Sequence, residues 1–218
     1  MFDTRLVPLT RTPLKRLAIY LDRWNVKADQ ITLIGFMIGM LAVPALALNW
    51  YSVALVAIAL NRFFDGLDGA LARIQGISDA GGYLDIVLDF IFYSAVCLGF
   101  LLADLDRNGG WAGLLMLSFM GSGATFLAFS AVSGKYSIDN PDYPQKSLYY
   151  MGGLAEGSET ILFLILFCLF PQYFPILAGV FAVLCWVTTG SRLWSGYLTL
   201  KHLERQHNHN QDSNKSGK

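Results

Sequence analysis

Six long apolar runs dominate this chain and fix the class of structure that it can form. A transmembrane helix needs about 20 mostly apolar residues, and runs near this length occupy residues 31–49, 51–64, 82–103, 111–132, 159–170 and 176–200. The second run reaches spanning length only by continuing to Ala72, and the fifth only by beginning near Gly153. Charged residues make up 15% of the chain, whereas soluble domains carry about a quarter. The sequence therefore predicts an all-α integral membrane bundle of six transmembrane helices.

The segments outside these runs divide the chain into three parts. Residues 31–200 form the six-helix domain, preceded by residues 1–30 and followed by the polar residues 201–218. Residues 13–25 place apolar side chains on one side of a helix and charged ones mostly on the other, which predicts an N-terminal amphipathic helix in the headgroup layer; a solvated surface helix is the alternative. These apolar residues are Leu14, Leu17, Ala18 and Leu21. The low complexity of 201–218 predicts a disordered tail.

Lysine and arginine gather on one side of the six-span arrangement. Those on that side are Arg5, Arg11, Lys15, Arg16, Arg23, Lys27, Arg73, Lys135, Lys146, Lys201, Arg205, Lys215 and Lys218. The other side carries only Arg107. Because Lys and Arg concentrate in cytoplasmic loops, we expect a multi-pass protein with both termini in the cytoplasm, in a bacterial inner membrane.

Four carboxylates interrupt the second and third runs. Asp65 and Asp68 are three residues apart, Asp85 and Asp89 are four apart, and each pair therefore shares one helix face. The two faces belong to consecutive antiparallel helices, so all four carboxylates can converge below the cytoplasmic surface. A charge inside a membrane helix costs roughly 2.5–3.5 kcal/mol on insertion scales, so such a cluster indicates function. Bound protons or divalent cations would neutralise it, and oxygen-only ligands suit Mg²⁺, Mn²⁺ or Ca²⁺ rather than zinc.

Small residues and two arginines accompany the acids. Gly66 and Gly69 lie within a helix, where each costs about 1 kcal/mol relative to alanine. Close helix packing would explain them, but beside acidic ligands they also leave room for a charged or flat ligand. Arg73 supplies a cation suited to a phosphate, and Arg62 is expected to offset the acidic cluster.

These residues form one continuous pattern, Asp65-x2-Asp68-Gly69-x2-Ala72-Arg73 followed by Gly81-x3-Asp85-x3-Asp89. The pattern resembles the signature of the CDP-alcohol phosphotransferase (CDP-alcohol phosphatidyltransferase) family, D-x2-D-G-x2-A-R-x8-G-x3-D-x3-D, and all of its fixed residue types are present. Seven residues rather than eight separate Arg73 from Gly81. The missing residue falls in the turn between two helices, where loop length varies easily. The wider resemblance, to phosphatidylglycerophosphate synthase-like members, covers about residues 13–200.

The resemblance implies a role for each matched residue. Two divalent metal ions, either Mg²⁺ or Mn²⁺, would be held by Asp65, Asp68, Asp85 and Asp89. Asp89 would also act as the general base that removes the proton of the acceptor hydroxyl. Gly69 and Ala72 would line the cytidine pocket with Gly66 beside them, and Arg73 would contact the diphosphate. The implied reaction transfers a phosphatidyl group from CDP-diacylglycerol to a small alcohol and releases CMP, in phospholipid biosynthesis. The family also implies a homodimer, and nothing indicates a nucleic-acid partner.

The acceptor is less constrained than the donor. A candidate pocket for a phosphorylated acceptor such as glycerol 3-phosphate consists of Arg192 with Lys135 and Lys146, which lie in the connection between the fourth and fifth runs. The alternatives are that Arg192 snorkels or pairs with an acid, and that the lysines only set topology. Glu156 and Glu159 either start the fifth helix, whose N-terminus favours acids, or lie near the acceptor or metal. Serine, inositol phosphate, choline and phosphatidylglycerol are alternative acceptors within the family.

Two other functions use similar residues. An intramembrane prenyltransferase also binds metal and diphosphate, but its acidic motifs would lie far apart in a longer bundle. A cation or proton transporter would use the carboxylates as a relay, but inverted repeats and interrupted helices, typical of transporters, are not evident in the sequence. The phosphatidyltransferase is therefore the favoured hypothesis.

Overall fold

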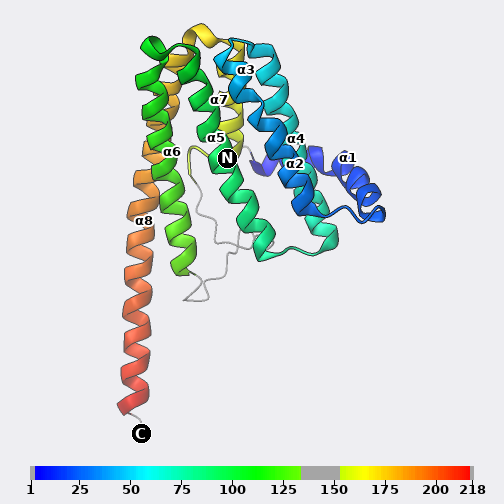
Figure 1. Cartoon of the computed structure of the whole chain (residues 1–218). Helices are drawn as coiled ribbons and strands as arrows, with labels where there is room; N and C mark the ends of the chain where they lie inside the picture. The colour runs from blue at the N-terminus through cyan, green and yellow to red at the C-terminus, as the bar shows by residue number, and fades with distance from the viewer. Residues whose placement is uncertain (1–2, 134–152, 217–218) are drawn as a thin grey trace.

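The computed structural model describes residues 3–133 and 153–216, and within them the side chains of residues 13–132 and 153–205. The described chain is all-α (Figure 1). Its elements in order are α1 (Asp3–Arg23), α2 (Ala28–Met40), α3 (Ala42–Ala47), α4 (Tyr51–Gln75), α5 (Asp79–Ala103), α6 (Leu105–Ser133), α7 (Gly157–Leu169), the short 3₁₀ helix η2 (Pro171–Tyr173) and α8 (Phe174–Ser216). In the bundle α2 packs along α4, α6 packs along α8, and α5 contacts α2, α3 and α6.

Four segments of the described chain are long and apolar enough to cross a membrane: Ala28–Ala47, Asp79–Ala103, Leu105–Val132 and Pro171–Arg205. Helix α7, with 13 residues, is shorter than a usual span. Helix α4 has 25 residues but carries four charged side chains, Arg62, Asp65, Asp68 and Arg73. The all-α class is confirmed, and four of the six predicted spans meet this criterion. The other two stay predictions.

Local chemistry explains where several helices end. The first predicted span is divided at Leu41 into α2 and α3, because the ring of Pro44 has no N–H and clashes with the carbonyl four residues earlier. Asn25 and Asn49 follow α1 and α3 with φ of 55° and 60°, and asparagine tolerates this left-handed conformation well. Only Asp104 separates α5 from α6, and its Oδ1 accepts a hydrogen bond from the Arg107 N–H at 3.0 Å and caps α6.

Helix α1 is longer than predicted and packs on α4. It begins at Asp3 rather than near Pro13. Its Leu14, Ala18 and Leu21 belong to one apolar cluster with Leu67, Ala70 and Leu71 of α4. Tyr20 and Trp24, near its C-terminal end, are exposed.

An aromatic cluster closes one end of the bundle, at the top of Figure 1. The ring of Phe100 on α5 stacks on Phe174 of α8, with centroids 4.4 Å apart, and meets the edge of Phe167 on α7. All three side chains are fully buried. Tyr51 of α4 also stacks on Phe100, so this aromatic end joins four helices.

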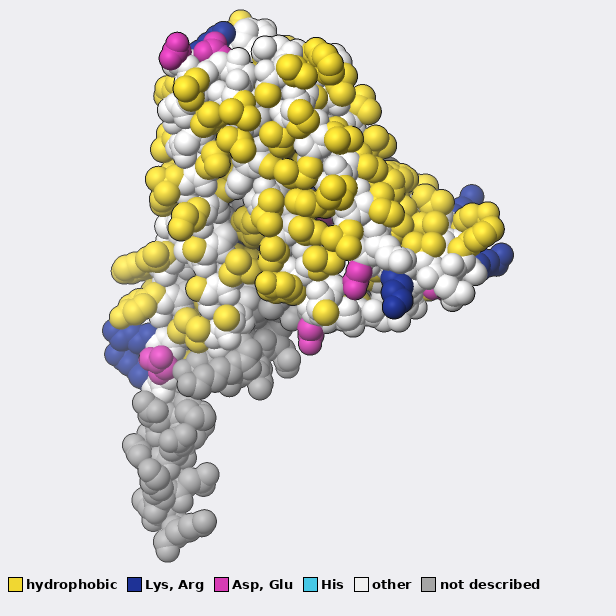
Figure 2. Space-filling view, in the orientation of Figure 1, with side chains coloured by type: hydrophobic (Ala, Val, Ile, Leu, Met, Phe, Trp, Pro, Cys, Tyr) yellow, Lys and Arg dark blue, Asp and Glu magenta, His cyan; other side chains and the backbone are white. Residues whose placement is uncertain are grey.

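The outer surface of the bundle is largely apolar. Figure 2 shows hydrophobic side chains across most of the visible face, with charged side chains gathered at its upper tip and along its lower edge. This distribution suits a hydrocarbon layer bounded by two polar interfaces. Helix α8 continues to Ser216, which differs from the disorder predicted for 201–218. Residues 201–209 contain Lys, Leu, Glu, Arg and Gln, which favour helix, and no Gly or Pro.

Candidate active site

Three of the predicted metal ligands meet between α4 and α5. Carboxylate oxygens of Asp65, Asp68 and Asp85 all lie within 4.8 Å of one another. Asp68 is buried, at 6% exposure, and Asp65 and Asp85 are half-buried. A pocket at this place is lined by Thr32, Gly35, Phe36, Asn61, Arg62, Asp65, Asp68, Asp85, Leu88 and Asp89. The predicted convergence of the two acidic faces is therefore present, and α2 supplies a third wall.

The turn between α4 and α5 sets their relative position. Gly76 ends α4 with φ of 103°, which glycine adopts without strain. Ser78 caps α5, its Oγ accepting a hydrogen bond from the Gly81 N–H at 3.0 Å. A Cβ on Gly81 would lie 3.1 Å from Oδ1 of Asp29, so a glycine suits the close approach of α2. The shortened turn thus keeps both acidic faces directed at each other.

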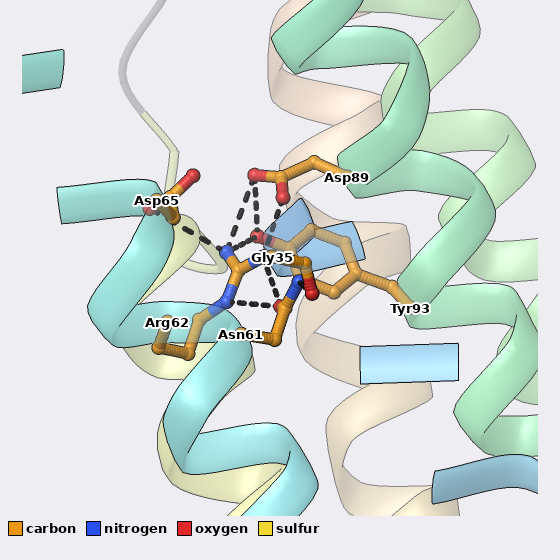
Figure 3. Close-up of polar contacts among 6 residues, drawn as sticks. All are labelled: Gly35, Asn61, Arg62, Asp65, Asp89 and Tyr93. Atoms are coloured by element: carbon orange, nitrogen blue, oxygen red, sulfur yellow. Dashed lines mark hydrogen bonds and ion pairs between the residues drawn. The ribbon is translucent and has the colours of Figure 1, made fainter. Parts of the chain in front are cut away.

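Asp89 lines the same pocket as the three-carboxylate group. Its carboxylate is bound by Arg62 (Figure 3). Arg62 Nη2 donates to Asp89 Oδ1 at 2.6 Å, and Nη1 donates to Oδ2 at 3.3 Å. The Tyr93 hydroxyl, one turn further along α5, donates to Asp89 Oδ2 at 3.0 Å. Arg62 Nη1 also lies 3.7 Å from Asp65 Oδ2. The expectation that Arg62 offsets the acidic cluster is confirmed, and its main partner is Asp89.

Asn61 and α2 hold this arginine in place. Asn61 Oδ1 accepts hydrogen bonds from Arg62 Nε at 2.9 Å and from Nη2 at 2.6 Å. Asn61 Nδ2 in turn donates to the Gly35 carbonyl at 3.0 Å. A Cβ on Gly39 would lie 2.9 Å from three Asn61 side-chain atoms. Glycine at position 39 therefore lets α2 approach α4 closely enough to orient the asparagine.

The small residues predicted to line the nucleotide pocket face different neighbours. A Cβ on Gly69 would lie 3.6 Å from Nη1 of the exposed Arg73, so these two positions share one side of α4. Ala72 is half-buried on the same helix. A Cβ on Gly66 would instead lie 3.1 Å from Cδ1 of Leu14. Gly66 thus lies against α1, and its placement beside the cytidine stays a prediction.

The carboxylate group fits a hard divalent cation. Oxygens on opposite sides of one Mg²⁺ or Ca²⁺ ion are about 4–5 Å apart, which matches the 4.8 Å limit within the group. Asp68 Oδ2 is buried and has no hydrogen-bond partner among the described residues. A buried carboxylate oxygen normally has a partner, and a cation would supply one. Asp65, Asp68 and Asp85 would hold the ion.

The predicted acceptor residues are placed only in part. Arg192 on α8 is buried at 6% exposure, and its Nη1 contacts the Ser122 carbonyl and hydroxyl of α6 at 3.4 and 3.3 Å. Its guanidinium also lies over the Phe126 ring. Lys135 and Lys146 lie outside the described residues. The structure thus places Arg192 in the interior between α6 and α8.

Glu156 and Glu159 start α7. Glu156 Oε1 accepts from the Gly153 N–H at 2.9 Å, and Glu159 Oε2 accepts from the Glu156 N–H at 3.2 Å. This capping box supports the helix-start interpretation of both acids.

Sequence reasoning missed Asn61, Tyr93, Thr32 and Gly35. Tyr93 follows Asp85 and Asp89 at successive four-residue intervals, so helical periodicity could have placed it on the same face. Asn61 was identifiable as a polar residue within an apolar run. Thr32 and Gly35 lie on another helix, and no local pattern connects them to the acids.

A membrane-type helical bundle with an interior carboxylate cluster suited to hard cations defines a class of intramembrane metal-binding proteins. Sequence comparison then identifies the member of this class: residues 25–194 match the CDP-alcohol phosphatidyltransferase family. The chain belongs to this family and is a CDP-alcohol phosphatidyltransferase.

Individual relatives agree with this assignment. Inner membrane protein YnjF of Escherichia coli is 53% identical over 206 residues, which are 94% of this chain and 100% of that protein. The archaetidylinositol phosphate synthase of Pyrococcus horikoshii is 30% identical over 88% of this chain and 94% of that enzyme. Together with the four apolar segments, the similarity to an inner membrane protein supports a multi-pass integral membrane protein.

The fold also matches solved structures. The phosphatidylinositol phosphate synthase PgsA1 of Mycobacterium tuberculosis, solved with CDP-DAG bound, superposes with a TM-score of 0.64 at 20% identity, over 84% of this chain and 93% of that one. The same enzyme in complex with manganese and citrate superposes with a TM-score of 0.63 at 21% identity, over 84% of this chain and 88% of that one. At this level of identity the match concerns the fold.

Proposed function

We propose that the protein transfers a phosphatidyl group from CDP-diacylglycerol to an alcohol and releases CMP, as a step of phospholipid biosynthesis. The observation that carries the proposal is the meeting of Asp65, Asp68 and Asp85 within 4.8 Å, with Asp89 beside them, in a chain of this family. Binding of CDP-DAG by PgsA1, which shares the fold, supports the choice of donor.

The reaction assigns a task to each side chain. The acceptor oxygen forms a bond to the phosphatidyl phosphorus, the bond from that phosphorus to the CMP oxygen breaks, and CMP leaves with the electron pair. Asp89 takes the acceptor proton, and Arg62 and Tyr93 orient its carboxylate. Gly69 and Ala72 line the nucleotide pocket with Gly66 beside them, and Arg73 binds the diphosphate. The active complex would hold two divalent ions, either Mg²⁺ or Mn²⁺. They would supply the positive charge that stabilises the leaving group.

The acceptor in this proposal carries a phosphate. Arg192, Lys135 and Lys146 are its proposed contacts, because a phosphate favours arginine and lysine partners. The sequence favoured glycerol 3-phosphate, whereas similarity to archaetidylinositol phosphate synthases favours inositol phosphate. A panel of radiolabelled glycerol 3-phosphate, inositol phosphate, serine and unphosphorylated inositol distinguishes these acceptors. Transfer to serine or inositol alone would contradict a phosphate-binding role for Arg192.

The membrane arrangement proposed here has six spans, with α4 and α7 as the two additional ones. Both termini and the active site lie on the cytoplasmic side, α1 lies in the headgroup layer, and two copies form a homodimer. The distribution of Lys and Arg supports the sidedness. Reporter fusions after residue 218 and between Arg107 and Gly110 should report opposite sides of the membrane.

The decisive experiment measures CMP release from CDP-diacylglycerol by purified protein in detergent, with Mg²⁺, Mn²⁺ or EDTA. Wild type should require the metal, and Asp89→Asn should lose at least about 100-fold of its rate because general base catalysis contributes about 10²–10⁴-fold. Asp106→Asn is the matched control, an exposed acid on α6 outside the pocket lining. Metal-independent turnover, or full activity of Asp89→Asn, would overturn the mechanism.

A further inference from the structure

Arg62 lies between two of the four signature carboxylates. Its Nη1 is 3.3 Å from Asp89 Oδ2 and 3.7 Å from Asp65 Oδ2 (Figure 3). The three carboxylates within 4.8 Å of one another are Asp65, Asp68 and Asp85. The guanidinium therefore takes the position of a cation between the group of three and the fourth acid.

Every N–H of this guanidinium has an acceptor. Nε and one Nη2 hydrogen go to Asn61 Oδ1, the other Nη2 hydrogen goes to Asp89 Oδ1, and Nη1 donates to Asp89 Oδ2 and the Tyr93 hydroxyl. Its side chain is 10% exposed. The guanidinium carbon lies 5.2 Å from the Phe92 ring centroid and 5.4 Å from that of Tyr93. Displacing it would break several buried interactions, so it is a fixed part of the site.

We propose that Arg62 is a positioning residue that serves in place of a second cation, so that the protein alone holds one divalent ion and binds a second only together with the diphosphate of its substrate. The inference rests on the proposed function. Four carboxylates with Arg62 carry three net negative charges, and one divalent ion leaves a single one. A second ion would make the whole centre, Arg62 included, net positive, and the two ions and the guanidinium would repel one another at short range.

The CDP-lipid removes that obstacle because its diphosphate brings two negative charges and additional oxygen ligands. Arg62 meanwhile keeps the Asp89 carboxylate oriented by two hydrogen bonds instead of leaving it free to ligate an ion. Loading of the second ion is thereby coupled to loading of the donor substrate. Without the positive charge of Arg62, the four carboxylates would attract two ions whether or not the substrate is present.

The test counts Mn²⁺ ions by equilibrium binding and electron paramagnetic resonance on the full chain in detergent, with and without CDP-diacylglycerol. Two ions about 3.5–4 Å apart give a spin-coupled signal that one ion cannot give. Wild type should bind one Mn²⁺ alone and a coupled pair with CDP-diacylglycerol. Arg62→Gln should bind a coupled pair without lipid, with second-site affinity raised about tenfold or more by loss of the positive charge.

Two further variants separate charge from structure. Arg62→Lys keeps the charge without the planar fork, so it should retain one-ion binding while its CMP release falls. Arg62→Gln/Asp89→Asn removes both charges of the pair and should return to one-ion binding. A merely structural role would lower Mn²⁺ affinity in all of these variants, together with their melting temperatures.

The outcomes distinguish this inference from the proposed function. A spin-coupled pair of Mn²⁺ ions in wild type without lipid overturns the inference, even where Arg62→Gln fails to fold. Binding of only one Mn²⁺ ion by a folded Arg62→Gln also overturns it. CMP release by wild type in either case leaves the phosphatidyltransferase function standing. Wild type that binds Mn²⁺ as expected but releases no CMP contradicts the proposed function, and the ion counts alone then decide the role of Arg62.

Discussion

The two ends of α5 show how one helix serves chemistry and stability with different residues. In its first half, Asp85 and Asp89 line the acidic pocket, and Tyr93 donates a hydrogen bond to Asp89. Near its end, Phe100 is fully buried among aromatic rings of three other helices. Like charges at the first end destabilise the folded chain, whereas close packing at the second end stabilises it. The aromatic end therefore stabilises a helix whose other end carries destabilising like charges.

The largest expected effect lies at the carboxylate end. Asp85→Asn removes one of the proposed metal ligands, and since loss of outer-shell partners alone costs about 10–100-fold, CMP release should fall by more than ~100-fold. The melting temperature without metal should stay the same or rise, because one of four like charges is gone. Initial rates and thermal unfolding in detergent measure both. A large drop in metal-free stability would show that this end supports the fold after all.

The next effect lies at the aromatic end. Phe100→Ala leaves a cavity among Phe167, Phe174 and Tyr51. It should lower the free energy of unfolding by about 3 kcal/mol, the bottom of the range for buried phenylalanine, because lipid rather than water surrounds the helices when they separate. Mn²⁺ affinity of the folded fraction should be unchanged. Phe63→Ala, at an exposed ring of α4, is the control and should change stability little. Altered Mn²⁺ affinity would mean that the ends are coupled.

Two glycines, each close to a neighbouring side chain, provide a matched pair of test variants. A Cβ on Gly39 would lie 2.9 Å from Asn61, and a Cβ on Gly99 would lie 2.9 Å from Leu46. Each alanine variant should cost about 1–3 kcal/mol of stability through overpacking. Gly39→Ala should also reduce CMP release, because it displaces the asparagine that holds Arg62. Equal activity in the two variants would show that the position of Asn61 has no catalytic consequence.

The smallest effect concerns two helix caps. Ser78 caps α5 at the carboxylate end, and Asp104 caps α6 at the other end. Replacing either with alanine should cost about 1 kcal/mol. Only Ser78→Ala should weaken Mn²⁺ binding measurably, because its helix carries Asp85 and Asp89. Unchanged Mn²⁺ affinity would show that the first turn of α5 does not set the ligand geometry.

Much of the site could be predicted because it follows from spacing along single helices. The three- and four-residue intervals placed Asp65 with Asp68 and Asp85 with Asp89 on single helix faces. The short turn between the two antiparallel helices brought these faces together. Helix ends were less predictable. Hydropathy does not report the local backbone interactions on which three helix ends depend. These are the division at Leu41, the single-residue turn at Asp104 and the continuation of α8 to Ser216.

The side-chain contacts between helices could not be predicted from the sequence. Arg62 and Asp89 are separated by 27 positions, and Gly66 lies against Leu14 of a helix far away in the chain. The same small residue suits a ligand or a packed neighbour, and only the arrangement of α1 on α4 shows which face it occupies.

The sequence by itself determined an apolar helical bundle, two acidic helix faces and a family signature, because periodicity and hydropathy are properties of consecutive residues. The tertiary structure decided that three acids share one group while the fourth is bound by Arg62. It did so because α2 and α4 approach closely at glycines, so that Asn61 holds Arg62 while Arg62 and Tyr93 both bind Asp89. Side-chain geometry between helices is set by that packing rather than by spacing within any one of them.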